Sequence, residues 1–191
     1  RGSTAEQLVN LESCATGLRR AEPATVAVLF AAGCVLTILG FLFFQYVVGL
    51  PPCPLCLEQR YAFYFGLALS IMFSFGASHG AARKVMMIGF AGLALLMAYN
   101  AGLGAYHAGI EWKFWPGPAE CSGTGADFRG SGGLLSQLQH GVSVVRCDQA
   151  AWRLFGISLP GWNVLVSGTM AALAAWGCRG IYLRGGDAQK T

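Results

Sequence analysis

Four cysteines carry the clearest chemical signal in the sequence. Cys53 and Cys56 form a C-x-x-C inside PPCPLCLEQR, and Cys121 and Cys147 follow later in the chain. A closely spaced thiol pair is suited to thiol–disulfide exchange, so a redox relay is the favoured interpretation. Two structural disulfides remain an alternative, although a C-x-x-C loop closes too little chain to stabilise a fold strongly. A zinc site of four thiolates is the other alternative, although the second pair lacks the short knuckle spacing.

The prolines of PPCPLC place the two sulfurs of the motif differently. A new helix can begin only after Pro54, which puts Cys56 in its first turn, near the positive end of the helix dipole. Arg60 follows at i+4 on the same face. Both effects favour a thiolate at Cys56, although Arg60 could also be an arginine that reaches the membrane interface. Cys53 is expected outside the helix and more exposed, where it can meet a soluble partner.

A relay also needs a terminal electron acceptor. The sequence has no Rossmann or P-loop glycine pattern and no C-x-x-C-H for haem, so a small lipid-soluble acceptor such as a membrane quinone fits. Asn100, Gly104, His107 and Glu111 form one helical stripe, and such polar positions in a membrane segment need an explanation. We expect His107 and Arg60 to flank a quinone headgroup. A histidine solvated at the interface is the alternative.

The other cysteines and the polar neighbours of the motif are interpreted without a redox function. Cys14, Cys34 and Cys178 are expected to be small apolar residues rather than redox centres. Glu58 and Gln59 are expected to be solvated at the level of the lipid headgroups.

Composition indicates the elements that must position these residues. The 191 residues are 54% hydrophobic and only 12% charged, whereas about 25% charged residues is usual in soluble domains. Four apolar segments, at about 24–47, 61–77, 85–106 and 160–182, approach the roughly 20 residues that a membrane helix needs. The second should begin near Leu57. We therefore predict an all-α, four-helix transmembrane bundle.

The distribution of Lys and Arg predicts the orientation of the bundle. Cytoplasmic loops carry an excess of these residues. One side holds eight of the 13: Arg1, Arg19, Arg20, Arg83, Lys84, Arg179, Arg184 and Lys190. The tails 1–23 and 183–191 are therefore expected in the cytoplasm, with the opening RGS set aside as typical of a cloning remnant. The loops at about 48–57 and 107–159 should face the periplasm of a bacterial cell, where disulfides persist. The scattered charges give no support for nucleic-acid binding.

The long outward loop has two notable parts. A glycine-rich stretch around RGSGG separates Cys121 from Cys147 and would give a resolving pair freedom to move. After Cys147, we predict a short helix in the membrane interface, with an apolar side made by Ala151, Trp152, Leu154 and Phe155. Pro160 should start the fourth span.

Together these features resemble the disulfide bond formation protein B (DsbB) family. The resemblance covers about residues 24–182 and depends on PCPLCLEQR, YHAGIEWKFWPGP, the Cys121/Cys147 pair and CDQAAWRLFGISLPGWN. It implies a four-helix bundle in the bacterial inner membrane with both tails cytoplasmic. It also implies ubiquinone or menaquinone as the acceptor and a DsbA-like periplasmic thiol oxidase as the partner.

The resemblance further implies a role for each cysteine. Cys121 would form the mixed disulfide with the oxidase, and Cys147 would be its partner in the loop disulfide. Cys53 would receive electrons from the loop, and Cys56 would reduce the quinone. Arg60 matches an arginine linked to quinone binding, and His107 is a looser match.

Two rival functions belong to other classes. A vitamin K epoxide reductase-like enzyme is also four-span and uses a quinone, but its C-x-x-C follows the loop cysteines, whereas here it precedes them. The other rival is a membrane scaffold or metal-binding protein with structural cysteines. No catalytic metal is expected.

Overall fold

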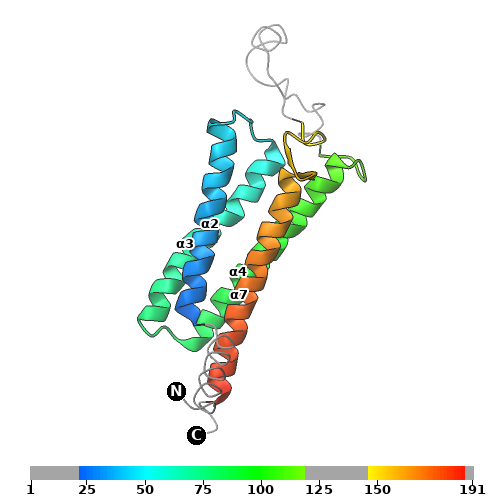
Figure 1. Cartoon of the computed structure of the whole chain (residues 1–191). Helices are drawn as coiled ribbons and strands as arrows, with labels where there is room; N and C mark the ends of the chain where they lie inside the picture. Colours follow the sequence, from blue (N-terminus) through cyan, green and yellow to red (C-terminus); the bar gives the residue numbers. More distant parts are fainter. Residues whose placement is uncertain (1–21, 119–145, 188–191) are drawn as a thin grey trace, which may run out of the picture.

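The computed structural model is a bundle of four long helices (Figure 1), and it describes residues 22–118 and 146–187. The helices are α2 (Pro23–Tyr46), α3 (Pro54–Ser78), α4 (Arg83–Glu111) and α7 (Leu159–Asp187). All four contain segments long and apolar enough to cross a membrane. The predicted all-α bundle of four transmembrane helices is therefore confirmed.

The chain runs up and down through the bundle. The start of α2, the α3–α4 turn and the end of α7 lie at one end (Figure 1). The α2–α3 connection, the end of α4 and the start of α7 lie at the other end, called the cysteine end below. α4 packs mainly against α7, and α2 packs mainly against α3.

Helix boundaries follow local chemistry. The chain leaves α2 through Gly49, which has φ +80°, and the two prolines that follow have no N–H to continue a helix. Pro54 takes the first position of α3, where its missing N–H costs nothing. α4 continues to Glu111, beyond the predicted end near 106, so the turn that carries His107 is helical.

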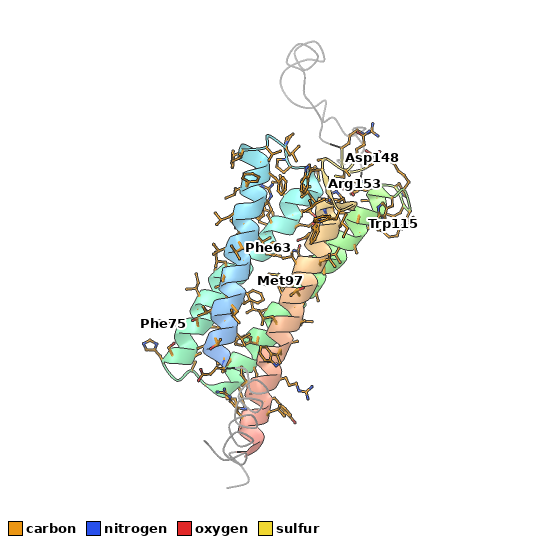
Figure 2. The ribbon with its side chains drawn as sticks, in the orientation of Figure 1. Phe63, Phe75, Met97, Trp115, Asp148 and Arg153 are labelled. Atoms are coloured by element: carbon orange, nitrogen blue, oxygen red, sulfur yellow. The ribbon has the colours of Figure 1, made fainter. Side chains whose placement is uncertain are left out.

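The interior is an apolar core contributed by all four helices. Phe63 on α3 and Met97 on α4 point between the helices (Figure 2) and are almost fully buried. Phe30 and Cys34 on α2 are also part of this core. Cys34 therefore packs as a small apolar residue. Cys178 is half-buried, and Cys14 lies outside the described residues.

The helix predicted after Cys147 is wrong. The segment instead forms an antiparallel hairpin of two short strands, β1 (Arg153–Leu154) and β2 (Ile157–Ser158). Phe155 and Gly156 between them have φ of 51° and 80°, which a two-residue hairpin turn requires and a helix does not allow. Phe155 lies at the tip and is 87% exposed, so the apolar side predicted for a helix does not exist.

Candidate redox site

The C-x-x-C forms the N-terminal cap of α3. The Cys53 sulfur accepts a hydrogen bond from the backbone N–H of Cys56 at 3.2 Å, a position usually filled by a Ser or Asp oxygen. The Cys53 thiol donates to the Cys56 sulfur across 2.7 Å. Both cysteines are free. Capping thus holds the two sulfurs in contact, and Cys56 lies in the first turn of the helix as predicted.

The expectation that Cys53 is the more exposed sulfur is wrong. Cys53 is only 3% exposed, whereas Cys56 is partly exposed. Leu55, Ile110 and Cys147 pack around Cys53. The last turn of α4 and the chain entering the hairpin cover this sulfur, so a large soluble protein cannot reach it directly.

Cys147 brings the long loop to the C-x-x-C. It is disulfide-bonded, and none of the other described cysteines is its partner. Cys121 lies outside the described residues. The ligand atoms of Cys53, His107 and Cys147 all lie within 4.8 Å of one another. Since a sulfur held in a disulfide is not a thiolate ligand, this trio is not a zinc site in the oxidation state of the structure.

Ion pairs of Asp148 connect the loop to the end of α4. The Asp148 carboxylate lies between Arg146 at 2.9 Å and Lys113 at 2.6 Å, and these partners lower the pKa of the carboxyl. The loop is thereby tied to the end of α4. Figure 2 shows Asp148, Arg153 and Trp115 all at the cysteine end.

The Cys53 thiol has a raised pKa. The hydrogen bond to Cys56 is the larger cause and burial the second, so the thiol stays protonated.

Cys56 lines a cavity of about 400 Å³ between α2, α3 and α7. Its walls are mostly apolar, and its few polar groups include Arg60, Gln59 and Asn163. Small-molecule sites typically combine an apolar cavity of about 300–1,000 Å³ with a few polar groups. The cavity is therefore a candidate site for a flat, apolar ring with polar substituents.

Arg60 is fixed at the wall of this cavity. Its guanidinium donates to the side-chain oxygen of Gln45 and lies 4.4 Å above the centre of the Phe41 ring, a cation–π contact. Both partners come from α2, so the charge is held where the two helices meet. Glu58, the residue before the buried Gln59, is exposed as predicted.

A buried chain of polar side chains runs beside the cavity. The expectation that Gln59 is solvated is wrong, because it is 6% exposed and contacts His107 at 2.9 Å and Asn163 at 2.6 Å. Asn163 in turn meets Asn100 and Ser167. Sequence reasoning missed Gln59 and Asn163, although two amides inside apolar spans are a signal of function.

The predicted stripe on α4 does face inward. Asn100, His107 and Glu111 are buried, and Gly104 allows the close approach of α7, since a Cβ there would lie 3.1 Å from the Asn163 amide nitrogen. His107 is not among the residues that line the cavity. It lies behind Gln59, and its Nε2 is 3.7 Å from the Cys53 sulfur.

Comparison with known proteins places the chain in a family. The family model described as disulfide bond formation protein DsbB matches residues 23–177. The chain belongs to the DsbB family. The match spans all four helices except the last part of α7, and it confirms the resemblance drawn from the cysteine motifs.

Individual DsbB relatives agree with this assignment. Disulfide bond formation protein B of Verminephrobacter eiseniae is 33% identical over 171 residues, which cover 85% of this chain and 92% of the relative. The protein of the same name from a Polaromonas species is 28% identical over 150 residues, covering 76% and 84%. No solved structure gives a significant match. This DsbB protein is thus a multi-pass membrane protein of disulfide bond formation.

Proposed function

We propose that this DsbB protein reoxidises a DsbA-like periplasmic thiol oxidase and passes the electrons to a membrane quinone, either ubiquinone or menaquinone. One observation carries the proposal. The Cys53 sulfur lies within 4.8 Å of the sulfur of the disulfide-bonded Cys147 and 2.7 Å from the sulfur of Cys56, and Cys56 lines an apolar cavity. These contacts support a path for electrons from the loop to the cavity through Cys53.

The sulfur chemistry balances over four exchanges. A thiolate of the oxidase attacks Cys121 in its proposed disulfide with Cys147, forming a mixed disulfide and releasing Cys147 as a thiolate. Cys147 then attacks Cys53 of an oxidised Cys53–Cys56 pair, and Cys56 leaves as the thiolate. The second thiol of the oxidase resolves the mixed disulfide and leaves oxidised.

The released Cys121 thiolate then attacks Cys147, which restores the loop disulfide and returns Cys53 as a thiol. The net result is one disulfide gained by the oxidase and one lost by the C-x-x-C. The described sulfurs have the pattern expected after this step, with Cys53 and Cys56 free and Cys147 bonded.

The residues of the cavity fit a quinone. The apolar walls suit its ring, and Arg60, Gln59 and Asn163 offer N–H donors for its oxygens. A bound quinone would be the oxidant, taking up two electrons and two protons to become a quinol. Cys56 is the cysteine that lines the cavity, Arg60 would contribute a positive charge there, and Cys53 is held beneath it out of contact with water.

Redox potentials explain why a quinone is needed. A DsbA-like oxidase has a reduction potential of about −120 mV, whereas the reduction potentials of structural disulfides lie below about −300 mV. For a two-electron couple, about 30 mV corresponds to about 1.4 kcal/mol, so an ordinary disulfide could not reoxidise this partner. Continuous removal of electrons by a respiratory quinone can drive the cycle.

The proposed location is the bacterial inner membrane, with both tails in the cytoplasm and the cysteine end in the periplasm. The excess of Lys and Arg in the tails and in the α3–α4 turn supports this orientation. Labelling of engineered single cysteines from outside intact cells tests it. A cysteine placed in the hairpin should react, and one placed in the α3–α4 turn should not.

Activity is tested with purified protein in detergent, a reduced DsbA-like oxidase and a short-chain ubiquinone. Quinol should form in step with oxidation of the partner. Cys56→Ala should abolish quinone reduction, and Cys121→Ala should abolish transfer from the partner. Cys34→Ala is the matched control, because this cysteine lies in the apolar core. Full turnover without both Cys53 and Cys56 would contradict the relay, and stoichiometric zinc binding would favour a metal site.

A further inference from the structure

The buried polar side chains beside the cavity form a series of hydrogen bonds in which each side chain donates to the next, from Asn100 through Ser167 and Asn163 to Gln59. Ser167 donates its hydroxyl to the Asn163 oxygen at 3.3 Å. Asn163 donates its amide N–H to the Gln59 oxygen at 2.6 Å. Asn100 on α4 donates to Ser167 at 2.9 Å, and this bond begins the series. Gln59 therefore has its oxygen engaged by Asn163.

This arrangement determines what Gln59 presents to His107. With its oxygen turned to Asn163, its amide nitrogen faces the His107 Nδ1 at 2.9 Å. An amide nitrogen can only donate, so Nδ1 must accept. The proton of the neutral ring then resides on Nε2, the nitrogen that lies 3.7 Å from the Cys53 sulfur. The ring also forms a hydrogen bond with the backbone of Cys147. Since Nδ1 faces Gln59, this bond falls to the Nε2–H, which is then shared between the Cys147 backbone and the Cys53 sulfur.

We propose that Gln59 is a positioning residue that holds His107 as the Nε2–H tautomer, with Asn163 orienting Gln59 from behind. His107 thereby directs an N–H toward Cys53 at the junction of the two cysteine pairs. An N–H donor stabilises a sulfur that becomes a thiolate during exchange, whereas the bare nitrogen of the other tautomer would repel it. This consequence rests on the proposed function, but the tautomer itself does not.

The same contacts could serve only to hold the helices together, because buried amides form hydrogen bonds between membrane helices. The two explanations differ in what they say about His107. Helix association alone does not depend on which ring nitrogen carries the proton. The proposed positioning fails if the tautomer is independent of Gln59 and Asn163.

Nitrogen NMR of the full chain with ¹⁵N-labelled histidine tests the proposal directly. The sequence has only three histidines, His79, His107 and His140, so the signals can be assigned with single substitutions. In the unaltered protein, reduced and free of quinone, we expect His107 to have a protonated Nε2 and a bare Nδ1. A protonated Nδ1 in the neutral ring would overturn the proposal.

Two variants change the chain of donors at different points. Gln59→Glu preserves the size of the side chain but replaces the donor with an acceptor, so Nδ1 should become protonated. Asn163→Leu leaves every direct contact of His107 in place and frees Gln59 to rotate. The preference for the Nε2–H form should then fall about tenfold, the value of one hydrogen bond of about 1.4 kcal/mol. An unchanged tautomer in either folded variant would overturn the proposal.

Ser70→Ala is the matched control. Ser70 is fully buried on α3, as Gln59 nearly is, but its hydroxyl bonds to the Leu67 carbonyl of its own helix. The His107 signals should not change in this variant, and a change would indicate a general effect of lost polarity. If the unaltered protein shows the Nε2–H form but reduces no ubiquinone, the proposed function fails while the positioning stands.

Discussion

The contact between the two sulfurs of the C-x-x-C makes a measurable prediction for Cys53. Its thiol donates to the Cys56 sulfur at 2.7 Å, and this bond, followed by burial, raises the pKa of Cys53 above its ordinary value. Cys56→Ala removes the acceptor but leaves Cys53 covered. A hydrogen bond to a charged group contributes about 1.5–3 kcal/mol, and about 1.36 kcal/mol corresponds to one pH unit. The ionisation of Cys53 should therefore move to lower pH by about one unit or more.

The assay is the rate of alkylation of Cys53 by iodoacetamide as a function of pH, followed by mass spectrometry of its peptide. Cys34→Ala and Cys178→Ala in the background remove the described thiols outside the C-x-x-C, and the protein is reduced mildly so that the Cys147 disulfide survives. In the reference protein Cys53 should react only at higher pH than an ordinary thiol, whose pKa is about 8.5. An ordinary profile, or one unchanged by Cys56→Ala, would refute the reasoning.

Three further predictions concern the cavity, the helix packing and the loop. Arg60→Met should raise the KM for a short-chain ubiquinone at least about tenfold, because the site loses a charged hydrogen-bond donor. Arg60→Lys should retain part of the affinity. Equal KM values in all three proteins would show that Arg60 does not contact the quinone. Gly104→Val should lower thermal stability, since an added Cβ already lies 3.1–3.2 Å from three atoms of α7, and an unchanged Tm would show that α7 can yield. Because Lys113 and Arg146 lower the pKa of Asp148, the ion pairs persist below the ordinary carboxyl pKa of about 3.9 and are lost only as the pH falls through the lowered pKa, so hydrogen exchange at 146–148 should accelerate only in strong acid. Asp148→Asn should give the same acceleration at neutral pH, with little loss of overall stability because the pairs lie at the surface.

The sequence was sufficient for the four spans because composition and length alone determine them. It also located Cys56 in the first turn of α3, since Pro54 can begin a helix but cannot lie inside one. The inward face of α4 followed from the spacing of Asn100 and His107. These features depend on the chain near each residue, and local pattern was enough to find them.

Features that depend on contacts between distant segments were missed. Cys53 is buried because Ile110 and Cys147 cover it, and neither neighbour is visible from the motif itself. The polar chain from Asn163 to Gln59 joins two different spans. The hairpin was misassigned because its apolar spacing also fits a helical turn, although Gly156 offered a turn signal.

The central claim is that Cys53 is the junction between the loop disulfide and the membrane-facing thiol. A disulfide map of the Cys121→Ala variant tests it most directly, after oxidation of its C-x-x-C by a short-chain ubiquinone and quenching in acid. Cys147 then has no loop partner, so its thiolate should attack Cys53 of the oxidised pair and release Cys56, and the account predicts a Cys53–Cys147 disulfide that joins sulfurs within 4.8 Å of each other. A map that contains only Cys53–Cys56, or that joins Cys147 to Cys56, would contradict it.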